Sequence, residues 1–494
     1  MGFWTFQACS MALTLLTIHV VCVCLRQKSK RSNPSLRLPP GPIKLPIVGN
    51  ALHFIGPFGR NPHRMLARLA ATYGPVMSFR AGTAGTFVVV SSPDAAREAL
   101  VANDAALAAR LVPDTARAMA HSSASLLFLP SSDAMWKQHR ATIGARFSSG
   151  QGLELTRHIR ERHARRLAEH FRACSGRPVI IGEAVLGTVL NVVSNIVFSE
   201  DVVDMRAQAG KQLFRDLMVS VIKEWTRPNV SDGFPFLAPL DITGSRRRIS
   251  RDLAKLYKFF DEEFIEPRLR SGEKRGDLFD VVLERLAKSE LTRSEITKFF
   301  TDIFLTASNT SRITVEWAMA LLLKYPDKMK KLRCELAANL LSKDFVEESD
   351  LANHPYLLCR GEGDVADAAS CASDTPDVPV GTYVLVNLLS IGRDPRVWPD
   401  PEEFKPERFL GADQAFYFRG TNFAFRPFGA GRRVCPGMDF AARLEPLVLA
   451  SILHKIDWTL PARMAPDDID LQRDRYSMML ELDRPLRAVP VSTV

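Results

Sequence analysis

The sequence predicts a mostly helical domain with small β-sheets at its edges, placed behind an N-terminal membrane anchor. Its 494 residues are 46% hydrophobic, which is enough for a large core and excludes a disordered or low-complexity chain. Helical patterns dominate between residues 92 and 340, whereas short alternating segments such as 85–90 indicate strands. The first 25 residues are mostly apolar and carry no formal charge.

The N-terminal stretch, residues 1–25, is long enough to cross a bilayer. The basic cluster RQKSKR follows at 26–31, and positive charge at this place predicts that the following chain stays in the cytosol. A cleaved signal peptide is the alternative, but no basic region precedes the stretch and no clear small-residue cleavage site follows it. We therefore expect a single-pass anchor, a basic and proline-rich spacer over 26–46, and one domain over 47–494.

Charge and cysteine usage narrow the class of protein. The formal net charge of +10 is spread along the chain, and no basic run is interleaved with aromatic residues, so we expect no nucleic-acid partner. A membrane surface or an acidic protein partner fits the basic excess better. The eight cysteines show no paired spacing of a disulfide framework, which indicates a reducing, cytosol-facing domain.

Two helices of the predicted domain bear on its chemistry. The pattern from Glu295 to Leu323, which ends before Pro326, is apolar on nearly every face and predicts a helix that runs through the interior. After residue 381 the chain turns to short strands and loops, followed by a final helix from about Met438 to His454.

The stretch FRPFGAGRRVCPGMDFA, which holds Cys435, carries the strongest chemical signal. Its glycines permit a tight turn, and Cys435 follows in a loop that leads into the final helix. The positive end of that helix favours the thiolate. With no second Cys or His nearby, a zinc or iron–sulfur cage is poorly supported, whereas a single axial thiolate on haem iron fits. The alternative is a buried structural cysteine beside a glycine turn.

Five positions at fixed spacing resemble the cysteine-loop signature of the cytochrome P450 superfamily, the haem-thiolate monooxygenases: Phe428, Gly431, Arg433, Cys435 and Gly437. The resemblance extends almost from end to end. It implies haem b as cofactor, with Cys435 as the axial ligand of the iron and these residues around it.

Two further motifs strengthen the resemblance. Trp136 and Arg140 resemble the W-x-x-x-R helix whose side chains contact a haem propionate in the family. The P-E-R-F sequence at 406–409 resembles the loop whose arginine, here Arg408, joins a buried salt-bridge triad. Without the cysteine loop, the first motif would only indicate a packed ring and a solvated charge.

Other segments are similar to plant microsomal members, near the group that hydroxylates monoterpenoids and diterpenoids; they are VEWAMALLLKYPDKM, IGRDPRVWPDPEEFKPERFLG and PLRAVPV. This resemblance implies O2 as co-substrate, NADPH-derived electrons from NADPH–cytochrome P450 reductase, a lipophilic substrate and an endoplasmic reticulum membrane. It also implies a substrate pocket lined by 101–130, 210–240 and 477–479. The reductase would dock on a basic face near Arg432, Lys137 and His139.

The polar patch TASNTS, residues 306–311, interrupts the long apolar helix. By itself it indicates a helix loosened by hydroxyl groups that bond back to carbonyls. In the family this place is the oxygen-binding groove, and on that register Thr310 matches the threonine that helps deliver protons to dioxygen. Asn309 stands where an acid is usual, and an amide does not take up or release a proton at neutral pH. We expect proton relay to be slowed or carried by water and Thr310.

The stretch PYLLCRGEGDVADAASCASDTPDVPVG, residues 355–381, departs from the family. Between 358 and 380 no helical or strand period survives, and the Glu-x-x-Arg helix that pairs with the P-E-R-F arginine is absent, so Arg408 is expected to be unpaired. Codons compatible with 361–368, read from their second base, can encode Val-Lys-Glu-Thr-Leu-Arg-Met. We interpret the segment as read in a shifted frame; the alternative is a tolerated acidic surface loop.

Three functional hypotheses follow. The first is a membrane-anchored monooxygenase. The second is an inactive or frameshifted relative that holds no haem. The third is a thiolate-haem isomerase or dehydratase that needs no reductase, which the presence of Asn309 keeps open.

Overall fold

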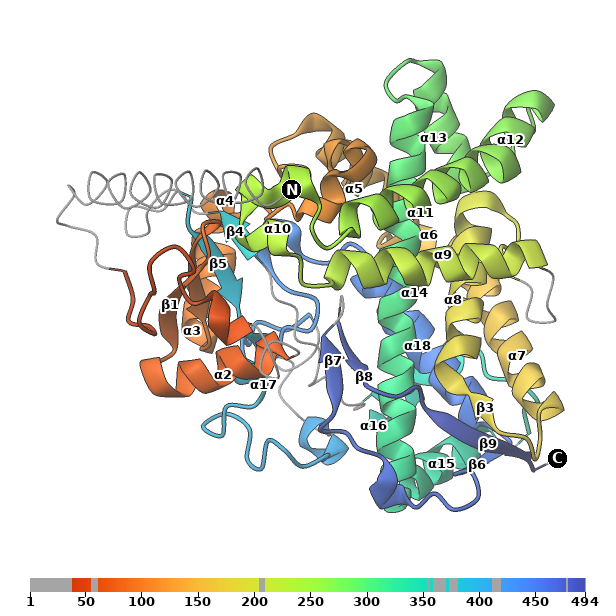
Figure 1. Cartoon of the computed structure of the whole chain (residues 1–494). Coiled ribbons are helices and arrows are strands. Elements are labelled where there is room, and N and C mark those ends of the chain that lie inside the picture. Colours follow the sequence, from red (N-terminus) through yellow and green to blue (C-terminus); the bar gives the residue numbers. More distant parts are fainter. Residues whose placement is uncertain are drawn as a thin grey trace, which may run out of the picture.

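Most of the described chain is helical, as the sequence predicts, and the sheets lie toward its edges (Figure 1). The computed structural model describes residues 38–54, 61–203, 209–340, 342–353, 355–358, 370–372, 381–410, 419–476 and 479–493. The predicted membrane anchor lies outside these ranges. The described end of the spacer packs on the first strand, where the Ser78 hydroxyl donates to the Pro39 carbonyl oxygen at 2.7 Å.

The helices have these bounds: α2 Pro62–Tyr73, α3 Pro93–Arg97, α4 Asp104–Leu107, α5 Ala134–Phe147, α6 Gly150–Leu155, α7 Arg157–Ala173, α8 Ile181–Phe198, α9 Ala209–Thr226, α10 Val230–Gly233, α11 Ser245–Phe260, α12 Glu266–Ser271, α13 Leu278–Ala287, α14 Arg293–Lys324, α15 Pro326–Leu340, α16 Pro355–Leu358, α17 Leu388–Gly392 and α18 Met438–Leu453. Short 3₁₀ turns include η4 Asp114–Ser123, η9 Pro406–Phe409 and η11 Gly431–Arg433.

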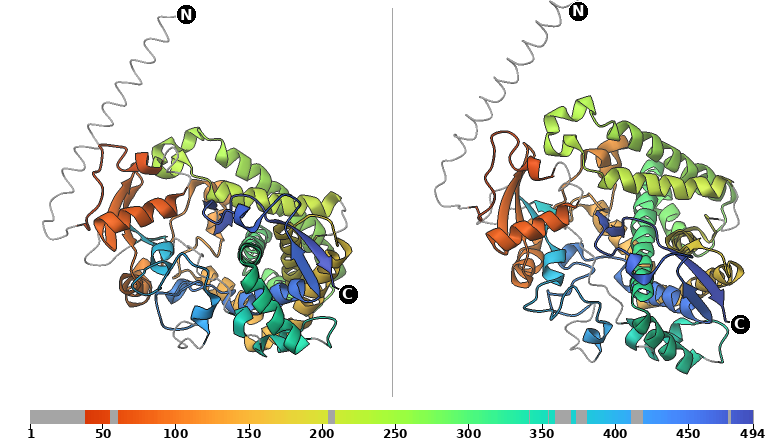
Figure 2. Two further views of the ribbon diagram at one scale, coloured as in Figure 1. Left: turned by 90° about the horizontal axis from the view of Figure 1, so that it is seen from below. Right: turned by 60° about the horizontal axis from the view of Figure 1, so that its bottom comes forward.

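The larger sheet has the order β1-β2-β5-β4 and stands at one side of the helices (Figures 1 and 2). β1 (Val76–Ala81) and β2 (Gly85–Val90) form an antiparallel hairpin, and β2 is the strand predicted over 85–90. β5 (Tyr383–Val386) runs parallel to β2, and β4 (Ser370–Ala372) runs antiparallel to β5. The three-residue strand β4 lies within 358–380, where the sequence shows no strand period, because pairing with β5 orders residues that have no β pattern of their own.

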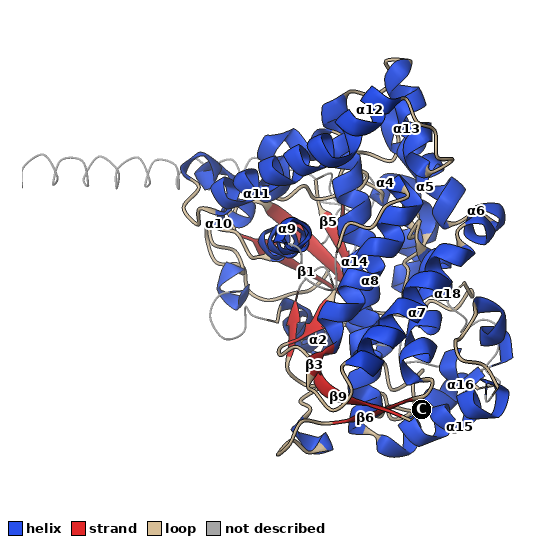
Figure 3. Ribbon diagram, turned by 90° about the vertical axis from the view of Figure 1, so that its right-hand side faces the viewer, coloured by secondary structure: helices blue, strands red, loops and turns tan. Residues whose placement is uncertain are grey.

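Of the two small sheets, the one formed by β3, β9 and β6 lies at the edge away from the larger sheet (Figure 3), whereas the β7-β8 hairpin contacts α2, where His63 and Arg64 pair with Asp474. The first has the order β3-β9-β6, with bounds β3 Val179–Ile180, β6 Ile456–Thr459 and β9 Arg487–Ser492. The second is the hairpin β7 (Asp474–Tyr476) and β8 (Leu480–Leu482).

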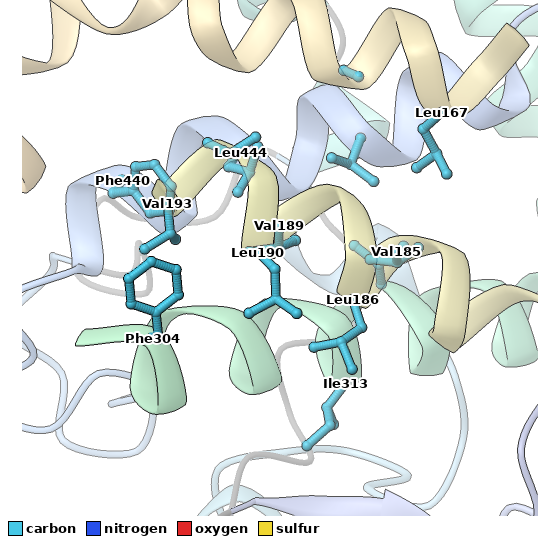
Figure 4. Close-up of a cluster of buried hydrophobic side chains, with 14 of the residues drawn as sticks. Leu167, Val185, Leu186, Val189, Leu190, Val193, Phe304, Ile313, Phe440 and Leu444 are labelled. Atoms are coloured by element: carbon cyan, nitrogen blue, oxygen red, sulfur yellow. The ribbon is translucent and has the colours of Figure 1, made fainter. Parts of the chain in front are cut away.

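Helix α14 runs through the core, and the prediction of a long interior helix is confirmed. Thr292 starts it with a capping box, in which its hydroxyl and the Glu295 side chain satisfy each other's main-chain N–H groups. It ends at Lys324, just before Pro326, where the ring would clash with a continued helix. Its apolar side chains meet those of α8 and α18, among them Phe304, Ile313, Leu190 and Leu444 (Figure 4).

Among the described residues, one helix, α8, is long and apolar enough to cross a membrane. However, 89% of its apolar window is buried inside the protein, and α8 packs on α14. An apolar helix that is buried in this way belongs to the protein core.

Candidate functional site

Cys435 lies in the loop between η11 and α18, at the place that the sequence predicts. Its main-chain N–H donates to the Phe428 carbonyl oxygen at 3.0 Å, which closes the loop. The thiol is half-buried and forms no disulfide. No side chain caps the first turn of α18, so the N-terminal amides of that helix keep their positive potential beside the sulfur. This environment favours the thiolate, which is the form that binds a metal.

Glycine is required at the turn before the cysteine. Gly429 and Gly431 have φ angles of +70° and +67°, in the left-handed region that other residues rarely adopt. A Cβ atom on Gly431 would also lie 2.0 Å from the Leu100 carbonyl oxygen, whereas one on Gly429 would meet nothing within 4 Å. The close approach of Gly431 to the chain at Leu100 is thus what seats the loop.

Trp136 and Arg140, from α5, come to the same place as the cysteine loop. The Arg140 guanidinium donates to the Val434 carbonyl oxygen at 2.7 Å, one residue before Cys435. The guanidinium carbon of Arg433 lies 4.7 Å from the centre of the Trp136 ring, and that of Arg140 lies 5.4 Å from it. Burial lowers the pKa of Arg140, while the negative charge of Cys435 raises it. Both guanidinium groups therefore supply positive charge near the sulfur.

Arg433 is held by main-chain oxygens on the other side of the ring. It donates to the carbonyls of Ala108 (2.9 Å), Leu126 (3.4 Å) and Leu129. The Trp136 indole N–H donates to the same Leu126 carbonyl at 3.1 Å. These carbonyl contacts fix the orientation of the Arg433 guanidinium and of the Trp136 ring beside the cysteine loop.

One face of α14 is accessible midway along an otherwise buried helix. The positions on it are Thr306, Ala307, Thr310 and Thr314, which are spaced by about one turn. The Thr310 hydroxyl donates to the Thr306 carbonyl oxygen at 2.7 Å, as the sequence predicts for a helix loosened by hydroxyls. Its oxygen can still accept a hydrogen bond from a ligand or water.

Asn309 is buried, and its side-chain oxygen accepts a hydrogen bond from Arg312 Nε at 3.1 Å. Arg312 also bonds Glu316 at 2.7 Å and pairs with Glu481 at 3.2 Å. The carboxylates of Glu316 and Glu481 already balance the charge of Arg312. An acid at position 309 would add a third buried carboxylate to these three residues, whereas the neutral amide of Asn309 does not. Structure and sequence agree that position 309 holds no proton donor of the acid type.

The residues around Cys435 fit a haem. A single thiol, two arginines and an indole converge there, and a Cβ atom on Gly437 would be in ordinary van der Waals contact with the sulfur, at 3.9 Å. Within the described ranges, no group of three or more His, Cys, Asp or Glu side chains could hold a bare metal ion. The donor set is that of one axial ligand with charged partners for propionates, not of a metal cage.

Comparison with known proteins decides the family. The profile of Cytochrome P450 matches residues 39–358 and 373–483. The chain belongs to the cytochrome P450 family. The family implies a haem cofactor and monooxygenase chemistry. Between the two matched ranges the profile skips residues 359–372, inside the segment that the sequence analysis identifies as aberrant.

Curated relatives match this P450 over nearly its whole length. It is 37% identical to oryzalexin E synthase of Oryza sativa subsp. japonica, covering 97% of each chain. It is 36% identical to geraniol 8-hydroxylase of Catharanthus roseus, covering 96% of this chain and 98% of the relative. It is 36% identical to carnosic acid synthase of Rosmarinus officinalis, covering 93% and 94%. The predicted likeness to plant terpenoid hydroxylases is confirmed.

The expectation that Arg408 is buried and unpaired is wrong. Its side chain is half-buried, and it donates to the main-chain carbonyls of Pro399, Asp400, Glu403 and Lys405 at 3.0–3.3 Å. The loop wraps around its own arginine and satisfies the donors locally. These hydrogen bonds all go to carbonyls, and within the described ranges Arg408 forms no salt bridge; its charge, after that of Lys405, still helps to lower the pKa of Asp400.

Arg408 also lines a pocket of about 480 Å³, formed with the C-terminal end of α14, α17 and residues 467–472. This pocket is distinct from the predicted substrate pocket, because its described lining includes no residue of 101–130 or 210–240. Those two segments do meet elsewhere, where the His121 and Trp225 rings lie 4.8 Å apart.

His139 does not lie on a docking surface, contrary to the sequence-based expectation. Its side chain is fully buried and stacks on Phe299 with ring centres 4.2 Å apart. Burial, helped by Arg285, lowers its pKa to about 4 even though Asp302 acts in the opposite direction. Lys137 and Arg432 are exposed as expected, and Arg432 pairs with Asp104 at 3.2 Å. On a helix, residues two apart point to nearly opposite sides, so α5 places Lys137 on its exposed face and His139 on its buried face.

The sequence analysis missed Asp302, a buried carboxylate on α14 that contacts His121, Ser125 and the main chain of Leu126. An acid inside an apolar helical run was the available signal, since a buried charge must be paired.

We predict that Gly431→Ala destabilises the protein far more than Gly429→Ala. Both variants carry the cost of a left-handed backbone, about 1–2 kcal/mol, but only Gly431→Ala drives a Cβ into the Leu100 carbonyl. Thermal unfolding should show an additional loss of at least about 2 kcal/mol for Gly431→Ala. Haem content should fall in parallel. Equal losses for the two variants would contradict the close contact as the reason for glycine.

We predict an acid-sensitive step from His139. Because its pKa in the folded protein lies near 4 rather than 6.5, the unfolded chain takes up a proton that the folded chain resists as pH falls through this range. The free energy of unfolding should drop by at most about 3 kcal/mol on this account. His139→Phe keeps the stacked ring and should weaken the pH dependence of the free energy of unfolding, measured with urea. The dependence that remains should include the contribution of the buried His163, whose pKa is also about 4.

The exposed His158 provides the matched control for this experiment. His158→Gln should leave the pH dependence of unfolding as it is in the parent chain. An unchanged slope in His139→Phe would show that His139 is not the group responsible.

Proposed function

We propose that this P450 inserts one oxygen atom from O2 into a lipophilic terpenoid, with haem b bound through Cys435 and electrons drawn from NADPH through NADPH–cytochrome P450 reductase. The observation that carries the proposal is the single half-buried thiol at the start of α18, surrounded by Arg140, Arg433 and Trp136. The printed names of the relatives, geraniol 8-hydroxylase and oryzalexin E synthase, support the substrate class.

The proposed roles follow from the contacts. Cys435 would bind the iron, and its electron donation favours cleavage of the O–O bond when haem is present. Phe428, Gly431 and Gly437 would shape the loop around the sulfur, while Arg140, Arg433 and Trp136 would hold the propionates. A guanidinium has five N–H donors, so an arginine that bonds a carbonyl retains donors for a propionate.

Proton supply in this proposal rests on Thr310 and water. The Thr310 hydroxyl oxygen is accessible on the open face of α14, whereas the neighbouring Asn309 is tied to Arg312. Because an amide does not exchange a proton at neutral pH, Asn309 would orient groups without serving as an acid. We therefore expect slow proton delivery compared with a site that has a carboxylic acid at this place.

The substrate pocket and the membrane are proposed to lie on the same side of the catalytic domain. Residues 101–130 and 210–240, which meet at His121 and Trp225, would line the pocket together with 477–479, of which the structure describes Met479. An anchor at 1–25 would hold the domain on the cytosolic side of the endoplasmic reticulum membrane. The acidic reductase would dock near Lys137 and Arg432, without His139.

Residues 358–380 are proposed to be a misread segment. The gap in the family match at 359–372 supports this, as does the carbonyl-bonded Arg408 beside a pocket of about 480 Å³. A helix with Glu-x-x-Arg after Leu358 would bring a carboxylate to Arg408. Charge-assisted bonds of this kind are about twice as strong as bonds to neutral carbonyls.

Anaerobic reduction in the presence of carbon monoxide tests the haem site. We expect the thiolate-type Soret shift from the parent chain in the restored reading frame and its loss in Cys435→Ser, because a hydroxyl does not replace the thiolate as ligand of the iron. Cys174→Ser, at a half-buried free thiol elsewhere, should retain the shift. Retention of the shift in Cys435→Ser would contradict the assignment of the ligand.

Turnover then separates the hypotheses. NADPH-dependent oxidation of a terpenoid in the presence of the reductase supports the monooxygenase. Conversion that needs neither NADPH nor reductase would favour the isomerase or dehydratase hypothesis.

Sequencing the transcript across codons 350–390 tests the misread segment. We expect a coding sequence that restores Val-Lys-Glu-Thr-Leu-Arg after the PYL motif. A transcript that reproduces CRGEGDVADAASCASD would contradict the frame shift, and the chain as written would then be expected to lose its haem.

A further inference from the structure

The carboxylate of Asp302 lies at the centre of a buried polar cluster that the proposed haem site does not use. Asp302 belongs to α14 and is 1% exposed. Oδ1 lies 2.9 Å from His121 Nε2, while Oδ2 accepts hydrogen bonds from the Ser125 hydroxyl and the Leu126 main-chain N–H, both at 2.7 Å. A buried carboxylate is stable only when such donors surround it, so these contacts hold one another in place.

The cluster extends into the elements that cover the proposed substrate pocket. His121 Nδ1 lies 2.6 Å from the Tyr257 hydroxyl of α11, and the His121 ring packs on Trp225 of α9. His121 itself is fully buried in η4. Asp302 therefore ties α14 to η4 and, through His121, to α9 and α11.

The main chain of Leu126 connects the Asp302 carboxylate to side chains beside the cysteine loop. Its N–H donates to Asp302, while its carbonyl oxygen accepts from Trp136 Nε1 at 3.1 Å and from Arg433 Nη1 at 3.4 Å. The peptide groups on either side of Leu126 are planar, so rotation of the residue would disturb contacts at both its N–H and its carbonyl. This short segment is the connection between the buried acid and the two side chains beside Cys435.

We propose that Asp302 is a positioning residue that fixes Leu126, and through it Trp136 and Arg433, relative to α14. It thereby couples the cover of the substrate pocket to the surroundings of Cys435. The consequence for haem rests on the proposed function, but the coupling between the two segments does not, because it is a property of the protein contacts alone.

Amide hydrogen exchange of the full chain without haem tests the coupling. Asp302→Asn removes the negative charge and turns one acceptor oxygen into an NH2 group, so the charge-assisted bond from the Leu126 N–H is either lost or weakened to a bond with a neutral oxygen. We expect exchange at Leu126 to accelerate about tenfold or more. We also expect faster exchange at Cys435, whose N–H bonds the Phe428 carbonyl.

Asp277→Asn is the matched control, since Asp277 is a buried carboxylate of another cluster, bonded to Arg268 at 2.8 Å and to Ser199 at 3.0 Å. Asp277→Asn should leave the exchange rates at Leu126 and Cys435 unchanged, even when it lowers the global stability as much as Asp302→Asn does. Tyr257→Phe removes the hydroxyl beside His121 but keeps every donor to Asp302, and should leave Leu126 protected.

Two results would overturn the proposal: faster exchange at Leu126 with an unchanged Cys435 loop, or the same acceleration in Asp277→Asn. In the haem-loaded protein, Asp302→Asn should also lower the thiolate-type fraction in the carbon monoxide spectrum more than Asp277→Asn does. If the parent chain shows no such spectrum, the proposed function fails, whereas the exchange result still decides the coupling.

Discussion

The need to pair polar groups on a helix that crosses the core sets the geometry of this P450. Helix α14 is surrounded by the apolar side chains of α8 and α18, yet it carries Asp302, Asn309 and Glu316 in buried positions. Each finds specific partners: Asp302 the segment at 121–126, Asn309 the guanidinium of Arg312, and Glu316 both Arg312 and the Leu486 N–H. The contacts of Asp302 with 121–126 and of Glu316 with Leu486 join α14 to other segments and hold its rotation about its axis, and that rotation decides that Thr310 lies on the accessible face.

A second constraint acts at the cysteine loop, where backbone shape and charge work together. The left-handed glycines let the chain pass close to Leu100, and the loop then delivers Cys435 to the uncapped end of α18. Arg140 and Arg433 are oriented by carbonyl oxygens, and both place a guanidinium over the Trp136 ring beside the cysteine loop. Arg408 shows the same kind of bonding in its own loop, without an acid among its described partners.

Sequence reasoning succeeded where a local rule decides the outcome. The apolar pattern predicted that α14 lies in the core, and Pro326 predicted where this helix ends. The spacing of the glycines predicted the loop that holds Cys435. Reasoning failed where distant atoms decide. The burial of His139 depends on Phe299 from another helix. The carbonyls that satisfy Arg408 are close in sequence, but only the folded path of the loop brings them to the guanidinium. The strand β4 forms because β5 offers it a hydrogen-bonding edge.

The sequence alone determined the family, the mostly helical class, the thiol at position 435 and the amide at position 309, because these depend on residue identity and spacing. The tertiary structure alone decided which side chains surround that thiol and which charges stay uncompensated. It also joined Asp302 to Leu126 and Leu126 to Trp136 and Arg433, three segments far apart along the chain. Hydrogen bonds between such segments depend on angles and distances of a few ångströms, which packing of the whole core sets and a linear pattern does not encode.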